Sequence, residues 1–266
     1  MYTRAEINGR APMSASPRSD YNHPVKKRAL FIEHDHVTLS GPLWRAFENR
    51  GYEVVRMPIV EEHNFETPNV HVEWPDFSEY DVIVPMGSPW GVWEDDRIGN
   101  WLLPELELVT NAHNSGQPIF GVCFGGQLMA RALGGSVARA PRSEIGWHYV
   151  MTDFPEIVSN GPWFQYHWDR FQVPPGATEI ARTPIASQAF VMGRTLGLQF
   201  HPEIDLDVLD CWLEMDGGPE EIEGEGLNVE ILRKQTKAEE AGANSRAQAL
   251  VDYFLDHIAT SEIKPV

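Results

Sequence analysis

The sequence has very little cysteine and comparatively few basic residues. Its 266 residues include two cysteines, Cys123 and Cys211, which are too few for a disulfide framework and suit a reducing compartment. Lysine and arginine total 21 against 39 aspartates and glutamates, so the formal net charge is −18. A surface this acidic repels nucleic acid and anionic membranes, and neither is expected as a partner.

Long apolar runs and nucleotide-binding loops are also missing. No apolar stretch approaches the ~18 residues that a transmembrane helix needs, and residues 1–27 lack the apolar core of a signal peptide. We therefore expect a cytoplasmic protein. Neither a Gly-x-x-x-x-Gly-Lys-Ser/Thr loop nor a Ser-Gly-Gly-x-Asp-Ser sequence occurs, so the chain is not expected to drive a synthesis with ATP.

The remaining composition is that of a folded α/β protein. Apolar residues make up 42% of the chain, which supports a sizeable core. Residues 1–26 have a loop composition and are expected to form a flexible extension. Residues 27–266 are expected to form a single domain, with an acidic insertion at about 216–240 and a docking helix at about 241–259. We interpret the acidic run as a solvated face rather than a metal site, and predict that it is a mobile flap or a partner surface.

Alternating strands and helices in the first half indicate a parallel sheet. The strands are expected at 27–33, 52–57, 80–85 and 118–122, and the helices at 41–50 and 98–115. In the second half, short alternating stretches predict added hairpins, with strands at 136–140, 146–151, 179–183, 188–192 and 195–200. The predicted fold class is α/β, with a flavodoxin-like, mixed, mostly parallel sheet and helices on both faces.

Cys123 occupies a sharp corner between a predicted strand and a predicted helix. The apolar run 118–122 leads in, an apolar helical stretch at 128–133 leads out, and glycines flank the cysteine. A strand that turns at once into a helix presents its corner residue at the end of the sheet, as in a nucleophile elbow. The helix start that follows favours a thiolate and can hold an oxyanion. The alternative is a buried structural cysteine beside a helix.

A base for this nucleophile is present at the end of a later strand. His201 follows the apolar strand 195–200, so it is expected at the same edge of the sheet as Cys123. Glu203 lies two residues further on and can accept a hydrogen bond from the imidazole, which fixes its tautomer. Cys123, His201 and Glu203 would then form a catalytic triad. The alternative for His201 is a surface histidine in a turn.

These two motifs together resemble the class I, triad-type glutamine amidotransferases. The segments 121–127 and 199–203 carry the resemblance, and the chain is most similar to stand-alone members related to the glutaminase domain of GMP synthase. The resemblance implies hydrolysis of glutamine or another γ-glutamyl amide through a γ-glutamyl thioester. Cys123 would be the nucleophile, His201 the proton carrier and Glu203 its orienting group, with no cofactor and no metal.

The resemblance also implies roles for residues around the triad. The backbone N–H groups of Gly87 and Phe124 would form the oxyanion hole, although Gly87-Ser88-Pro89 stands where many relatives have Gly-Gly-Pro. Gln127 would contact the substrate at the start of the helix. A partial match to the relatives' Ser-His-Gly-Asp would add four more substrate contacts: Tyr166, His167, Trp168 and Asp169.

The sequence leaves the destination of the released ammonia or amine open. The chain could supply a separate ammonia-accepting synthase, act as a free-standing γ-glutamyl peptide or amide hydrolase, or be a catalytically silent regulatory subunit. A cysteine peptidase of the related elbow fold is disfavoured because Phe124 replaces the histidine that follows the nucleophile there. His34 and His36 are expected to be loop or surface histidines.

Overall fold

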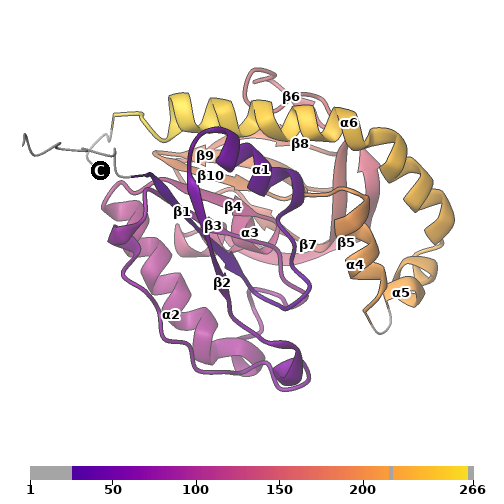
Figure 1. Cartoon of the computed structure of the whole chain (residues 1–266), viewed down its shortest axis with the longest axis horizontal. Coiled ribbons are helices and arrows are strands. Elements are labelled where there is room, and N and C mark those ends of the chain that lie inside the picture. The colour runs from indigo at the N-terminus through magenta and orange to yellow at the C-terminus, as the bar shows by residue number, and fades with distance from the viewer. Residues whose placement is uncertain (1–25, 216–217, 263–266) are drawn as a thin grey trace, which may run out of the picture.

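The computed structural model describes residues 26–215 and 218–262 (Figure 1). Its strands are β1 (Arg28–Glu33), β2 (Glu53–Pro58), β3 (Val82–Pro85), β4 (Ile119–Val122), β5 (Ser136–His148), β6 (Met151–Thr152), β7 (Trp163–Gln172), β8 (Thr178–Arg182), β9 (Ser187–Met192) and β10 (Thr195–Leu198). Its α-helices are α1 (Gly41–Asn49), α2 (Asp95–Asn114), α3 (Phe124–Ala132), α4 (Leu206–Leu213), α5 (Gly218–Gly224) and α6 (Val229–Tyr253). Three short helical turns complete it: η1 (Glu62–Asn64), η2 (Phe77–Glu79) and η3 (Phe254–Ile258).

One eight-stranded sheet organises the molecule, in the order β2-β1-β3-β4-β10-β9-β8-β6. The strands from β2 to β10 in this order are mutually parallel, and β9, β8 and β6 extend the sheet as antiparallel neighbours. The parallel part has the 2-1-3-4-5 order of flavodoxin-like folds, in which sites form at the carboxyl ends of the strands. The predicted α/β fold class is confirmed.

Alternating side chains of the buried strands pack against helices on both faces. On β1, Phe31 contributes to the core that holds α1 and α6, whereas Leu30 and Ile32 contribute to the core that holds α2 and α3. All three side chains are essentially inaccessible to water. A strand covered on both faces has no polar side, which is why the first strands read as continuous apolar runs.

The region after α3 differs from the sequence-based prediction. Two short strands were expected at 136–140 and 146–151, but β5 is one strand of 13 residues with an irregularity between Arg139 and Glu144. It pairs with β7, a ten-residue strand that the sequence did not predict, in a separate two-stranded antiparallel sheet. Both faces of β7 are covered by protein, so its polar and aromatic residues do not alternate in the apolar–polar pattern by which a strand is recognised in a sequence.

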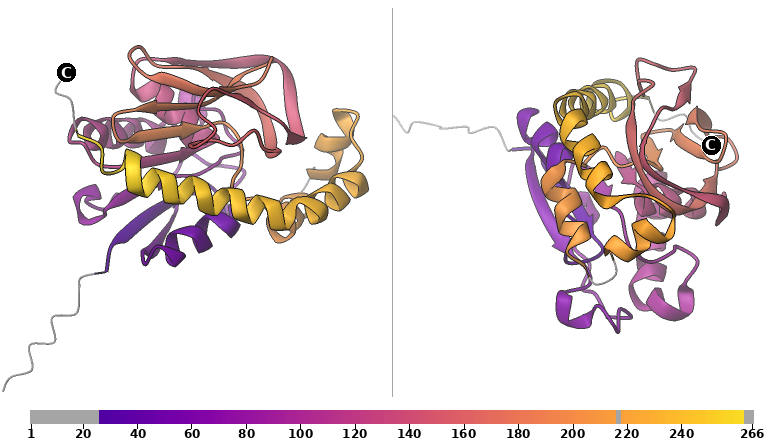
Figure 2. Two further views of the ribbon diagram at one scale, coloured as in Figure 1. Left: turned by 90° about the horizontal axis from the view of Figure 1, so that it is seen from above. Right: turned by 90° about the vertical axis from the view of Figure 1, so that its right-hand side faces the viewer.

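The boundary proposed between an acidic insertion and a docking helix at 240/241 is wrong. Helix α6 begins at Val229, where the Asn228 side chain accepts a hydrogen bond from the N–H of Ile231, and it runs unbroken to Tyr253. Figure 2 shows this helix extending along one side of the molecule. Residues 218–224 form α5, which packs with α4 and β7 in a small apolar core. The predicted extension at residues 1–26 lies almost wholly outside the described residues.

Candidate active site

Cys123 sits on a strained corner between β4 and α3. Its φ of 49° and ψ of −102° make it the one non-glycine residue with positive φ in the described part of the chain. Such a conformation costs on the order of 1–3 kcal/mol and persists only where the surroundings enforce it. The side chain is 7% exposed, at the carboxyl end of β4. This is the elbow geometry expected from the sequence.

Two glycines allow α3 to lie directly on the sheet beneath this corner. A Cβ on Gly125 would stand 1.9 Å from the carbonyl oxygen of Pro85, and one on Gly126 would stand 2.1 Å from that of Leu198. Both distances are well inside van der Waals contact, so any side chain here would push the helix away from β3 and β10. The small residues after Cys123 therefore hold the helix start, and the corner with it, in place.

His201 and Glu203 form a buried hydrogen-bonded pair after β10. The Nδ1 atom of His201 lies 2.7 Å from Oε1 of Glu203, and the residues are 4% and 1% exposed. The backbone N–H of His201 donates to the carbonyl of Phe164 at 2.8 Å, which anchors the residue to β7. Because Nδ1 faces a carboxylate, it carries the proton, and Nε2 is the ring nitrogen left for other chemistry.

The charge around His201 favours its protonated form. Burial lowers the pKa of the imidazole, but the carboxylate of Glu203 and then the nearby Cys123 raise it by more, to about 10. Nε2 makes no hydrogen bond within the described residues. The ring of Trp212 lies at 5.0 Å and nearly perpendicular to it, and so helps to keep water from this pair. A positive charge therefore stands beside the sulfur, as in cysteine–histidine nucleophile pairs.

Two glutamine side chains occupy the space beside the sulfur. Nε2 of Gln199 lies 3.7 Å from the Cys123 sulfur, and Nε2 of Gln127 lies 3.3 Å from both Oε1 of Gln199 and the carbonyl oxygen of Asp169. The sequence pointed to Gln127 but assigned no role to Gln199. The feature that could have identified Gln199 is its position: it is a polar residue at the end of an apolar strand. It also precedes His201 by two residues and so lies on the same side of the chain.

Gly87 lies at the same edge of the sheet, just after β3. A Cβ on Gly87 would be 3.4 Å from Cε1 of His201, so this loop is adjacent to the histidine. Its carbonyl oxygen accepts a hydrogen bond from Nδ1 of His34 at 3.0 Å. Phe124 is the first residue of α3, and the N–H of a first helical residue has no acceptor within its own helix. The structure thus brings Gly87, Phe124, Cys123 and His201 together.

The segment 166–169 lies in β7 rather than in a loop, and its side chains alternate in direction. His167 and Asp169 are buried, with Nδ1 of His167 at 2.9 Å from the Asp169 carbonyl oxygen and Nε2 at 3.4 Å from Glu144. Tyr166 and Trp168 point to the other face of β7, where they donate hydrogen bonds to Glu221 and Glu225 at 2.9 and 2.7 Å. Burial, reinforced by Glu221, raises the pKa of the Tyr166 hydroxyl.

Asp169 has a carboxylate oxygen that makes no hydrogen bond to the part of the chain that the structure describes. Its Oδ2 accepts a hydrogen bond from the indole of Trp93 at 2.8 Å, while its buried Oδ1 makes no hydrogen bond within the described residues. Trp93 itself is 56% exposed. The side chains of Tyr166, His167 and Trp168 already bond to the protein, which argues against them as primary substrate ligands.

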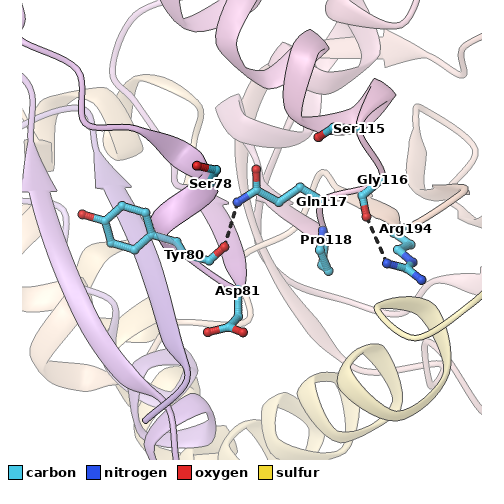
Figure 3. A pocket seen from close by; sticks show the side chains of 8 residues that line it. All are labelled: Ser78, Tyr80, Asp81, Ser115, Gly116, Gln117, Pro118 and Arg194. Carbon is cyan, nitrogen blue, oxygen red and sulfur yellow. Dashed lines mark hydrogen bonds between the residues drawn. The ribbon is translucent and has the colours of Figure 1, made fainter. Parts of the chain in front are cut away.

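A hollow elsewhere on the surface does not belong to this site. It has a volume of about 330 Å³ and lies at the residues that precede β3, β4 and β10, which is the opposite edge of the sheet from Cys123 (Figure 3). Its polar side chains are engaged: Gln117 donates to the carbonyl of Tyr80 at 2.9 Å and Arg194 to that of Gly116 at 3.2 Å.

The described residues include neither a membrane-spanning helix nor a metal-binding cluster. Among residues 26–215 and 218–262, no helix combines the length and apolarity needed to cross a bilayer. Nor do three or more His, Cys, Asp or Glu side chains gather there in an arrangement that could hold a metal ion. His34 and His36 both lie in the loop after β1, as expected, but His34 is fully buried, whereas His36 is exposed.

Fold and site together define an α/β protein built around a cysteine elbow at the carboxyl edge of its sheet. The family model for glutamine amidotransferase class-I matches residues 40–211, well over half of the chain. The chain therefore belongs to the class I glutamine amidotransferase family.

Two solved structures of glutamine amidotransferases have the same fold. A structure from Thermotoga maritima superposes with a TM-score of 0.75 at 25% identity, covering 87% of this chain and 99% of that one. One from Methylobacillus flagellatus gives 0.74 at 22% identity, covering 88% and 96%. The second likeness shows the fold alone.

Curated relatives are larger proteins named GMP synthase [glutamine-hydrolyzing]. That of Aeropyrum pernix is 34% identical over 151 residues, which is 52% of this chain and 28% of the relative. That of Thermomicrobium roseum is 36% identical over 131 residues, or 46% and 23%. The chain thus spans about a quarter of the length of these relatives.

Proposed function

We propose that this chain hydrolyses the carboxamide of glutamine, or of another γ-glutamyl amide, through a γ-glutamyl thioester on Cys123. The observation that carries the proposal is the cysteine on a strained elbow facing the same sheet edge as a buried His201–Glu203 pair with a 2.7 Å hydrogen bond. Membership of the class I glutamine amidotransferase family supports the choice of a γ-glutamyl amide.

In the first half-reaction the amide bond is exchanged for a thioester. The Cys123 sulfur attacks the amide carbon, and the thiol proton resides on Nε2 of His201. The tetrahedral intermediate collapses as His201 gives this proton to the leaving nitrogen, which departs as ammonia or an amine. Glu203 holds Nδ1–H throughout, so that Nε2 stays aimed at the reacting atoms and the imidazolium is stabilised.

In the second half-reaction water replaces the sulfur. His201 takes a proton from the attacking water, the new tetrahedral intermediate forms, and the carbon–sulfur bond breaks. Cys123 recovers its proton from His201, and the γ-carboxylate of glutamate leaves. Each cycle consumes one water and releases one glutamate, and it needs neither a cofactor nor a metal ion.

The negative charge of each intermediate would be held by backbone N–H groups of Gly87 and Phe124. Gly87 lies beside His201, and Phe124 opens the helix whose positive end faces the same space. Gln127 and the backbone of residues 166–169 would bind the rest of the γ-glutamyl group. The buried Oδ1 of Asp169, whose nearest charged partner is the guanidinium of Arg139 at 3.7 Å, makes no hydrogen bond among the described residues and is suited to the α-ammonium of that group.

The released ammonia either enters solution or passes to a separate synthase. A free-standing hydrolase should turn over unaided, whereas a synthase subunit should be nearly idle without its partner. A silent regulatory subunit would have no reason to keep the charged pair at His201 in place. Turnover by the chain alone therefore distinguishes the free-standing hydrolase from the partner-dependent subunit.

Glutamate release from glutamine and a panel of γ-glutamyl amides tests this proposal. We expect turnover on at least one of them, its loss in Cys123→Ala, and its retention in Cys211→Ala, which removes the second thiol and serves as the matched control. A folded wild-type chain that releases no glutamate from any of these amides, and whose Cys123 forms no covalent adduct with a glutamine-like electrophile, would rule the proposal out.

A further inference from the structure

His34 is a buried imidazole that touches both residues proposed to form the oxyanion hole. We propose that His34 is a positioning residue for Gly87 and Phe124, and that its Nδ1–H donor, held in place by Glu105, is the group on which hydrolysis depends. This inference rests on the proposed function. His34 follows β1 at the carboxyl edge of the sheet, where the strand order reverses between β1 and β3.

The contact with Gly87 fixes the peptide that follows this glycine. Glycine has no Cβ to limit its φ and ψ, so the peptide planes on either side of Gly87 can rotate. The Gly87 carbonyl oxygen accepts from Nδ1 of His34 at 3.0 Å. The N–H of Gly87 belongs to the preceding peptide, whose carbonyl oxygen, on Met86, accepts from the N–H of Gly125 at 3.0 Å. The bond from His34 fixes the peptide that follows Gly87, so the two bonds together hold both planes around this glycine. An oxyanion hole needs such preorganised donors, because reorienting them during the reaction costs energy.

The contact with Phe124 fixes the second proposed donor. The His34 and Phe124 ring centroids are 4.5 Å apart, and the ring of Trp101 packs against both, at 5.4 and 5.9 Å. All three residues are at most 1% exposed. In so close-packed an interior, a shift of the His34 ring displaces the side chain, and hence the backbone, of Phe124.

Glu105 of α2 holds the other ring nitrogen of His34. Its two carboxylate oxygens lie 3.2 and 3.3 Å from Nε2 of His34, and neither residue is exposed. A carbonyl oxygen can only accept, so Nδ1 must donate to Gly87 whether Nε2 shares a proton with Glu105 as imidazolium–carboxylate or as neutral partners. Burial lowers the pKa of His34, but Glu105, together with the Gly87 carbonyl and Asp35, raises it by more, in agreement with the paired arrangement.

A merely structural role would have different consequences. Buried ion pairs often add little net stability, and breaking one destabilises the whole fold. A stability role would therefore lower turnover and Cys123 reactivity together. A positioning role lowers turnover while the sulfur keeps its reactivity toward a reagent that forms no oxyanion. Iodoacetamide is such a reagent, since it alkylates sulfur by displacement at a saturated carbon.

Two amide replacements separate the ring nitrogens. Both substitutions are introduced into the Glu105→Gln variant, so that neither leaves an unpaired buried carboxylate. Glu105→Gln alone, which still has His34, is the control. His34→Asn places an amide N–H near the position of Nδ1, facing Gly87. His34→Gln places it near Nε2, facing residue 105. The two variants have similar polarity and differ mainly in which contact they keep.

The measurements are kcat and KM for glutamate release, together with the rate of iodoacetamide alkylation at Cys123 by peptide mass spectrometry. We expect Glu105→Gln to stay near wild type and His34→Asn to follow it closely. His34→Gln should lose about 10²-fold in kcat, the typical effect of a missing oxyanion donor. Alkylation of Cys123 should be the same in all of them.

The inference is overturned if the Asn and Gln variants turn over equally, or if Glu105→Gln alone is as impaired as His34→Gln. It is also overturned if alkylation of Cys123 falls in parallel with turnover, or if either histidine variant fails to fold while Glu105→Gln folds, because His34 would then be a stability residue. A wild type that neither turns over nor forms the adduct with the glutamine-like electrophile is a different result, since it removes the proposed function itself.

Discussion

At the scale of single residues, the site depends on how few protonation states its buried groups can adopt. Nδ1 of His201 faces Glu203 and Nδ1 of His34 faces the Gly87 carbonyl, so both imidazoles have their tautomers set by a neighbour. One histidine then presents a free Nε2 near the sulfur, and the other presents only a fixed donor. The same side chain serves two purposes because its surroundings differ.

Glu203→Gln tests the orienting role of the carboxylate. The amide can present its N–H to Nδ1 and favour the wrong tautomer, and it cannot stabilise an imidazolium. We expect a loss of about 10²–10⁴-fold in kcat/KM, as for other triads that lose their carboxylate. Steady-state glutamate release measures this. Activity within a few-fold of wild type would show that Glu203 is dispensable.

The raised pKa of His201 predicts a stability change with pH. In Cys123→Ala, which removes the thiol's own titration, Glu203 still raises the pKa of His201 above the unfolded value of ~6.5. The native state therefore keeps a proton that the unfolded chain loses, so the free energy of unfolding is greatest below about pH 6.5 and falls as the pH rises through the folded pKa. That pKa is below the wild-type value of about 10, because Cys123 no longer contributes to it. A folded pKa one pH unit above the unfolded pKa corresponds to about 1.4 kcal/mol of stability.

Urea unfolding of Cys123→Ala across this range measures the slope. The matched variant Cys123→Ala with Glu203→Gln should show a much smaller fall over the same pH interval, because the interaction that raises the pKa is gone. Identical slopes for the two proteins would contradict the assignment of the raised pKa to Glu203.

The sequence predicted the site residues that belong to short motifs and missed those that meet only through contacts between distant segments. Cys123 is recognisable by its flanking glycines, and His201 and Glu203 by lying two residues apart after a strand. His34 and Glu105 are 71 residues apart, and nothing in their local sequence indicates that they meet. Gln199 was likewise visible only as part of a motif, because its partner Gln127 lies on a different element.

At the scale of elements, the close contact between α3 and the sheet is the feature that creates the elbow. Gly125→Ala and Gly126→Ala should each destabilise the fold by about 3 kcal/mol or more, because their Cβ atoms would overlap backbone carbonyl groups that cannot move aside. Gly99→Ala is the matched control, a glycine inside α2 whose Cβ would meet only Leu103 at 3.7 Å.

Gly99→Ala should raise stability by about 0.5–1 kcal/mol, the usual gain for alanine in a helix interior. Thermal or urea unfolding compares the three variants. If Gly125→Ala and Gly126→Ala are as stable as the control, the tight approach of α3 is not what holds Cys123 in place.

Most elements were predictable where apolar periodicity was strong. The parallel strands and α1 and α2 were located to within a few residues. β7 was missed because both of its faces carry polar and aromatic side chains. Their hydrogen-bond partners lie on other elements, as Glu221 of α5 does for Tyr166. The start of α6 was missed because residues 229–240 are polar, and their helix is stabilised by an N-cap and by α4 and α5 rather than by a long apolar stripe.

At the scale of the whole molecule, the topology gathers the site from distant segments. β1, β3, β4 and β10 lie side by side and parallel, so the residues that follow them, His34, Gly87, Cys123 and His201, meet at one edge. The opposite edge holds the hollow of Figure 3, whose side chains bond to the backbone. The topological rule could be applied from sequence alone for Cys123 and His201.

The overall charge of −18 gives a further prediction for the molecule as a whole. Because this net charge repels the phosphates of nucleic acid, the chain should not bind duplex DNA or RNA even at low salt, where electrostatic binding is strongest. Electrophoretic mobility shift at about 50 mM salt checks this. Binding that weakens steeply as salt is added would contradict it.

The most direct test of the central claim is capture of the covalent intermediate on Cys123. The chain alone is mixed with glutamine or the best amide of the panel, quenched in acid, and examined by intact-protein and peptide mass spectrometry. We predict a γ-glutamyl adduct on the peptide containing Cys123, absent in Cys123→Ala, present in Cys211→Ala, and discharged as the hydroxamate by hydroxylamine. Glutamate release without any adduct at Cys123, or with the adduct on another residue, would contradict the account.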